Sequence, residues 1–206
     1  MAKRVFDIFA SLVILILTLP LTAFAIIALA LARDGPLLFQ QERIGLNGQP
    51  FRILKFRTMR PERTQQIHAI TIGADPRITR IGNMLRQTKI DELPQLLNVL
   101  KGEMSLVGPR PETPIYVASY PEDLRRAIQS VRPGITDRAS IKYRNEAELL
   151  ATVPDPDLYY RSVILPDKLI IGAEYAQSHS LVGDLMIMID TLAAVLKPEK
   201  YWQRNS

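Results

Sequence analysis

The chain has 206 residues, with 26 Lys and Arg against 21 Asp and Glu, a net charge of +5, two histidines and no cysteine. The absence of cysteine excludes a disulfide framework, a thiolate metal site and a cysteine nucleophile, so carboxylates and hydroxyls must carry any catalysis. The basic excess suits anionic partners such as nucleotides, phospholipid head groups or nucleic acid, and the length suits one domain, or one domain plus an anchor.

An uncharged and almost wholly apolar stretch covers residues 8–32. A cleaved signal peptide, a spanning helix and a re-entrant hairpin all fit such a stretch. Pro20 lies near its middle and removes the N–H that would serve the Ile16 carbonyl, for which the Thr18 hydroxyl is a local partner. Basic residues lie at both ends, at Lys3 and Arg4 before it and from Arg33 after it. Because basic residues favour the cytoplasmic side, this placement favours a hairpin that enters and leaves by one face.

Two short strands are expected next, over residues 37–39 and 51–57, around a turn at residues 45–48. The second strand places Lys55 and Arg57 on the same face. They form either a solvated or head-group-facing edge, or part of a phosphate site. Residues 60–79 are polar and irregular, and residues 81–86 suggest a short helix.

The most informative stretch runs from Arg86 to Glu112. Leucines at helical spacing and the stop signal Gly102 predict a short helix that begins near Pro94. Asp91 and Glu92 would lie at its start, where they serve as ordinary caps or help to hold a metal and a phosphorylated substrate. Arg86 and Lys89 are near in sequence, and Pro109 and Pro111 make a rigid carrier for Arg110.

Two helices are expected in the last third of the chain, over residues 122–131 and 181–196. The second has a stripe of Leu185, Ile189, Leu192 and Leu196, which we predict to lie in the core. Arg144 is either a phosphate contact or a solvated loop cation. Tyr201 and Trp202 suit a membrane interface or a frayed end.

The uninterrupted run from Asp91 to Pro111 resembles the signature of the bacterial sugar transferases, the monotopic phosphoglycosyl transferases. The runs 55–59 and 132–136 also resemble family motifs, and Asp184 matches a family position. The chain departs from the family at residues 137–140, where many relatives have Gly-Leu-Ala-Gln, and at Leu19, where a serine is common before the proline. The resemblance implies a re-entrant helix-break-helix over residues 1–34 and a compact cytosolic catalytic domain over residues 35–206, predominantly α with a small β-hairpin.

The resemblance further implies transfer of a sugar-1-phosphate from a UDP-sugar to a polyprenol phosphate such as undecaprenyl phosphate, with release of UMP. This would be the first membrane step of glycan assembly, at the cytoplasmic face of the bacterial inner membrane among phospholipids and without nucleic acid. In this hypothesis Asp91 forms a covalent phosphosugar intermediate and Glu92 holds Mg²⁺. The cations that would bind phosphates are Lys55, Arg57, Arg86, Arg110 and Arg144. The competing hypothesis is a non-catalytic, membrane-anchored basic module that binds anionic lipid or nucleic acid.

Overall fold

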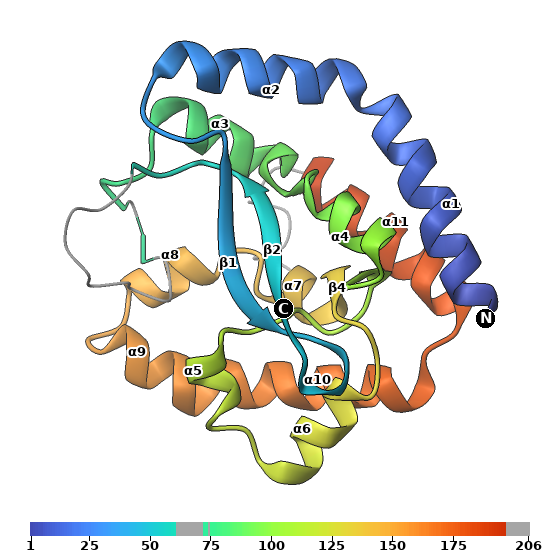
Figure 1. Cartoon of the computed structure of the whole chain (residues 1–206). Helices are drawn as coiled ribbons and strands as arrows, with labels where there is room; N and C mark the ends of the chain where they lie inside the picture. The colour runs from blue at the N-terminus through green and yellow to red at the C-terminus, as the bar shows by residue number, and fades with distance from the viewer. Residues whose placement is uncertain (61–71, 74, 197–206) are drawn as a thin grey trace.

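The computed structural model describes residues 1–60, 72–73 and 75–196. Helices dominate these residues, and the strands form two small two-stranded sheets (Figure 1). This architecture agrees with the α+β class expected from the sequence.

The chain begins with two helices, α1 (Ala2–Leu17) and α2 (Leu19–Ala32), which run along one side of the body in Figure 1. No single helix in the described part of the chain is both long and apolar enough to cross a bilayer, but α1 and α2 satisfy this test as a pair bent by 62°. The hydroxyl of Thr18 donates to the carbonyl of Ile14, at 2.7 Å. Our expectation that it would serve Ile16 was therefore wrong, because the hydroxyl follows the i−4 geometry that a threonine at a helix end favours.

One face of α1 packs on the body of the protein and the opposite face is exposed. Phe6, Ala10 and Ile14 contact the main hydrophobic cluster, which contains residues of β2, α4 and β3. The outward side chains of the helix pair are large and apolar, among them Phe9, Ile16, Leu17, Leu19 and Leu31. The helix pair therefore presents an apolar surface to whatever surrounds the protein.

The predicted hairpin is confirmed. β1 (Leu38–Ile44) pairs antiparallel with β2 (Pro50–Phe56), from Leu38 opposite Phe56 to Ile44 opposite Pro50. The turn between them contains Asn47 and Gly48 with positive φ, a conformation that these two residue types tolerate well.

The predicted central helices are also confirmed. α3 (Arg80–Gln87) begins at Thr79, whose hydroxyl caps the N–H of Gly82. A single 3-10 turn, η2 (Ile90–Glu92), follows, and then α4 (Gln95–Lys101), which ends at Gly102 with a φ of 89°. A left-handed residue at this position is the usual glycine ending of a helix.

A second sheet, absent from our expectations, joins β3 (Ser105–Val107) to β4 (Gly134–Thr136) in parallel. Strands of three residues are too short to show a periodic pattern in sequence. Gly108 directly follows β3, and Gly134 is the first residue of β4. A Cβ on Gly134 would lie 2.1 Å from the backbone nitrogen of Gly108. Only glycine permits this approach, which sets the position of the segment after β3.

The remaining helices close the body around a second hydrophobic cluster that includes Tyr116, Leu150, Tyr160 and Ile164. They are α5 (Pro114–Val117), α6 (Glu122–Gln129), α7 (Arg138–Lys142), α8 (Glu146–Ala151), α9 (Pro156–Tyr159), the π-helical turn η3 (Tyr160–Ile164) and α10 (Leu165–Ser178).

The last described helix, α11 (Leu181–Leu196), has the predicted extent, but a different face of it is buried. Our predicted core stripe is exposed: the exposed fractions are 45% for Leu185, 63% for Ile189, 62% for Leu192 and 82% for Leu196. The helix instead buries Asp184, Ile187 and Ala194, because polar contacts hold that side on the body. Tyr201 and Trp202 lie outside the described residues.

Candidate active site

The two acids of the central stretch lie on η2, directly before α4. Lys89 precedes them with a φ of 57°, which turns the chain sharply between α3 and η2. Leu93 and Pro94 have helical dihedrals, so the acids sit at the mouth of α4 as the sequence predicts. Asp91 is buried, with 7% of its surface exposed.

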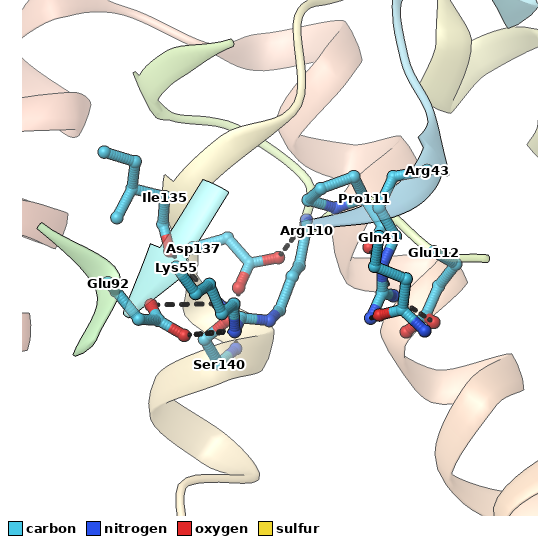
Figure 2. Close-up of polar contacts among 10 residues, drawn as sticks. All are labelled: Gln41, Arg43, Lys55, Glu92, Arg110, Pro111, Glu112, Ile135, Asp137 and Ser140. Carbon is cyan, nitrogen blue, oxygen red and sulfur yellow. Dashed lines mark hydrogen bonds and ion pairs between the residues drawn. The ribbon is translucent and has the colours of Figure 1, made fainter. Parts of the chain in front are cut away.

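Glu92 joins three elements that are far apart in sequence. Its Oε1 accepts from Nζ of Lys55 on β2 at 2.9 Å and from a guanidinium nitrogen of Arg110 at 2.5 Å. Figure 2 shows both cations converging on this carboxylate. The structure thus brings together Lys55, Glu92 and Arg110, three residues that we predicted for one site.

Arg110 is held at both its backbone and its side chain. Its N–H donates to Oδ2 of Asp137 at 3.1 Å, and its guanidinium donates to the carbonyl of Ile135 at 3.2 Å (Figure 2). Asp137 also caps α7, because its Oδ1 accepts from the N–H of Ser140 at 2.6 Å. The Asp137 carboxylate therefore couples the β4–α7 junction to the position of Arg110. Its role escaped the sequence analysis, although an Asp directly before a helix is a common N-cap.

Burial and the charges in this site shift the pKa values of the two neighbouring acids in opposite directions. Burial and then the charge of Glu92 raise the pKa of Asp91 to about 6, against the pull of Lys55, Lys89 and Arg86. Burial also raises the pKa of Glu92, but Arg110 and Lys55 outweigh it and hold that pKa well below its ordinary value. Both acids are therefore mostly ionised at neutral pH. Lys89, which we did not include among the site residues, contributes to this field.

Asp91 differs from Glu92 in its bonding as well. Its Oδ1 is buried and accepts no hydrogen bond from the residues that the structure describes. This oxygen of Asp91 can still accept a hydrogen bond, whereas Glu92 is already bound by two cations.

The other predicted phosphate ligands occupy different positions. Arg57 is buried, and its guanidinium donates to the backbone carbonyls of Pro36 at 2.5 Å and Leu29 at 3.4 Å. Arg144 donates to the carbonyl of Ala194 at 2.8 Å, near the end of α11. Arg86 lies in the last turn of α3, within electrostatic reach of Asp91. The structure therefore gathers Lys55, Arg86 and Arg110 around the acids, and gives Arg57 and Arg144 partners elsewhere.

The residues present are compatible with a magnesium ion of the kind that kinases and ATPases use. The described residues contain no group of three or more acidic or histidine side chains with a geometry for a metal. Mg²⁺ commonly takes only one or two carboxylates and completes its shell with waters and substrate phosphates. Glu92 would supply a carboxylate oxygen for such an ion.

Comparison with known proteins identifies the family of this chain. The sequence profile of the family described as bacterial sugar transferase matches residues 1–198, and the chain belongs to this family. A UDP-glucose:undecaprenyl-phosphate glucose-1-phosphate transferase of Caulobacter vibrioides is 39% identical over 199 residues, which cover 94% of this chain and 69% of that protein. The exopolysaccharide production protein PSS of Rhizobium leguminosarum is 39% identical over 202 residues, which cover 94% of each chain. The exopolysaccharide production protein ExoY of Rhizobium meliloti is 35% identical over 95% of this chain and 85% of that protein.

Proposed function

We propose that this protein transfers a sugar-1-phosphate from a UDP-sugar to undecaprenyl phosphate, releases UMP, and thereby starts the assembly of a bacterial polysaccharide. Family membership and the named activity of the Caulobacter relative support the class of reaction. The observation that carries the proposal to these residues is the unpaired, buried and largely ionised Asp91, which lies beside a carboxylate already bound by Lys55 and Arg110.

The reaction proceeds in two displacements at one phosphorus atom. In the first, an oxygen of Asp91 bonds to the β-phosphorus of the donor, the bond from that phosphorus to the bridging oxygen breaks, and UMP leaves with that oxygen. In the second, a phosphate oxygen of the acceptor bonds to the same phosphorus and displaces the carboxylate. The products are a polyprenol-diphosphate sugar and free Asp91. Carboxylates carry phosphoryl groups in this way in other enzymes.

The cations address the main physical barrier, which is the approach of anionic groups to one another. Arg110 has a planar fork that suits phosphate, and Lys55 supplies a compact charge beside it. When the donor diphosphate enters, it competes with Glu92 for these two cations, and the fixed positions of Arg110 and β2 leave little reorganisation to occur during the reaction. A magnesium ion on Glu92 would add positive charge at the leaving phosphate.

The apolar helix pair gives the site a location. We propose that α1 and α2 enter the cytoplasmic face of the inner membrane as a bent, re-entrant anchor, with their exposed apolar side chains in lipid. The acceptor phosphate lies at that surface, while the nucleotide arrives from water. An anchor of this type holds the catalytic acids where both substrates are present.

The decisive experiment separates covalent from direct transfer. The purified full-length protein in detergent is first given a panel of UDP-sugars with undecaprenyl phosphate, and UMP release identifies the donor. That donor, labelled in its sugar, is then given without acceptor. We expect label to remain on the denatured wild-type protein and to be absent from Asp91→Asn. Normal turnover without labelled protein would show that the acceptor attacks the donor directly. Salt-sensitive binding of anionic lipid, unchanged in Asp91→Asn and without any UMP release, would instead favour the non-catalytic module.

A further inference from the structure

Gln95, the first residue of α4, is fully buried, and the described part of the chain gives its side-chain amide no hydrogen-bond partner. Its exposed fraction is 0%, and among the described residues neither Oε1 nor Nε2 has a partner. A buried amide normally forms hydrogen bonds, since leaving one unpaired costs the free energy of removing it from water. An amide in this condition beside an active site calls for a functional explanation.

The next turn of the same helix shows what a structural amide looks like in this environment. Asn98 is also 0% exposed, but its Oδ1 accepts from the N–H of Leu54 at 3.0 Å and its Nδ2 donates to the carbonyl of Arg52 at 2.8 Å. These bonds attach α4 to β2. Gln95 makes no equivalent bond, so attachment to β2 does not account for it.

The nearest acceptor along the chain that also lacks a hydrogen bond is Oδ1 of Asp91. Within η2 and α4, the unpaired buried side-chain atoms are Oδ1 of Asp91 and the two polar atoms of Gln95. Leu93 and Pro94 have helical dihedrals, and side chains four residues apart on a helix are neighbours. The Nε2 of Gln95 can donate and the ionised carboxylate of Asp91 can accept, so the two residues can form one hydrogen bond that satisfies Nε2 and Oδ1.

We propose that Gln95 is a positioning residue for Asp91: its Nε2 donates to Oδ1 when the donor binds, and this hydrogen bond orients Oδ2 for attack on the β-phosphorus. The inference rests on the proposed function, in which Asp91 is the nucleophile. Hydrogen bonds of this type are commonly unformed in a substrate-free enzyme and shorten in the complex. A fixed carboxylate plane raises the fraction of encounters in which the attacking oxygen points at phosphorus.

The test is Gln95→Met, which keeps the length of the side chain and removes both polar atoms. Full-length protein in detergent receives the labelled UDP-sugar without acceptor, and the rate of protein labelling, the dissociation constant for UDP and the melting temperature are measured. We expect labelling to slow about 10- to 100-fold, a typical effect for a residue that orients a reacting group. UDP binding should not change, and the melting temperature should be unchanged or higher, because an unpaired buried amide has been removed.

Two further variants make the test selective. Gln95→Glu keeps the shape and the acceptor oxygens but removes the donor, and we expect labelling at least as slow as in Gln95→Met. Gln177→Met makes the same chemical change at an exposed position of α10, and we expect wild-type labelling. Wild-type labelling by Gln95→Met or Gln95→Glu would overturn the inference. A large loss of stability in Gln95→Met would overturn it too, because it would mean that the amide is bonded in the free enzyme.

The behaviour of Asp91→Asn separates this inference from the proposed function. If Asp91→Asn forms no adduct while Gln95→Met labels normally, only the role of Gln95 is wrong. If Asp91→Asn labels like the wild type, the proposed nucleophile is wrong and the inference fails with it.

Discussion

Lys3 and Asp184 are 181 positions apart in the chain, and Nζ of Lys3 lies 2.6 Å from Oδ2 of Asp184. The carboxylate of Asp184 is completely buried and also accepts from the hydroxyl of Tyr175 at 2.7 Å. The same hydroxyl lies 2.9 Å from the carbonyl oxygen of Val107, and its single proton is shared between these two acceptors. This network joins the start of α1 to α11, α10 and β3, so α1 is attached to the body of the protein by an ion pair at its first turn.

Removing the cation of this pair should destabilise the whole protein. In Lys3→Met the buried carboxylate of Asp184 keeps, among the residues that the structure describes, only the Tyr175 hydroxyl as a side-chain partner. We expect a loss of about 3 kcal/mol, typical for a buried ion pair with one member removed. Thermal unfolding in detergent measures the effect. Lys101→Met, at an exposed position of α4, is the matched control and should unfold like the wild type. Equal melting temperatures for all three proteins would show that the pair contributes nothing.

Arg110→Lys tests whether geometry or charge matters at the site. A lysine keeps the positive charge but cannot bond Glu92, the carbonyl of Ile135 and a substrate phosphate together. We expect kcat/KM for the UDP-sugar to fall about 100-fold, with the fold preserved, since a lost fork to phosphate is of the order of 2–3 kcal/mol. Arg126→Lys, on the exposed side of α6, should have wild-type kinetics. A fall of less than threefold for Arg110→Lys would mean that charge alone is sufficient.

Asp91→Asn should increase stability in the pH range where it abolishes labelling. Burial raises the pKa of Asp91 to about 6 in the folded protein, above its ordinary value of 3.8, so the folded state favours the protonated form. The contribution of this group to stability is therefore complete below about pH 4 and is lost as the pH rises through about 6. Asparagine does not titrate, so Asp91→Asn should be more stable than the wild type at pH 7.5 by up to about 3 kcal/mol, since the pKa of Asp91 rises from 3.8 to about 6 and each pKa unit corresponds to about 1.4 kcal/mol.

The measurement for this prediction is the difference in melting temperature between Asp91→Asn and the wild type across pH 4.5 to 8, in buffer with a chelator. The difference should shrink toward pH 4.5. A constant difference across this range would show that Asp91 titrates as it does in an unfolded chain.

Arg57→Leu distinguishes the two interpretations of this buried arginine. Its bonds to the carbonyls of Leu29 and Pro36 indicate a structural role, so the variant should lose about 2 kcal/mol or more from the carbonyls left buried and unpaired. The folded fraction should keep its KM for the UDP-sugar. Thermal unfolding and donor kinetics on the same preparation provide both values. An intact fold with a greatly raised KM would instead place Arg57 among the phosphate ligands.

The sequence was most informative where a residue's environment is local. The helix that follows Asp91 and Glu92, its glycine end and the hairpin with its turn depend on contacts within a few residues, and each was predicted from spacing and turn chemistry. The pattern of residues alone could not identify the site, because acids at the start of a helix look the same in sequence whether they only cap the helix or also bind a substrate. The resemblance of this stretch to the family signature favoured the second interpretation.

Other features depend on what a residue meets across the fold. Alternation along β2 placed Lys55 and Arg57 on one face, yet Lys55 meets Glu92 and Arg57 meets the end of α2. Helical spacing in α11 identified a stripe correctly but not the side that the body covers, because the buried side is selected by Lys3, Tyr175 and Thr136. The β3–β4 pairing joins two three-residue segments that carry no periodic signal of their own.

Lys55 on β2 and Arg57, which directly follows this strand, connect the acids of the site to the end of α2. Arg57 bonds a carbonyl in the last turn of α2, and Lys55, two residues earlier, bonds the acid beside the proposed nucleophile. With α2 seated in the bilayer as we propose, the height of Lys55 above the hydrocarbon is set by the bonds of Arg57 to the end of α2 and to the carbonyl of Pro36 in the loop that follows it. A shift of β2 by one residue would therefore move Lys55 out of register with the phosphate of a membrane-bound acceptor.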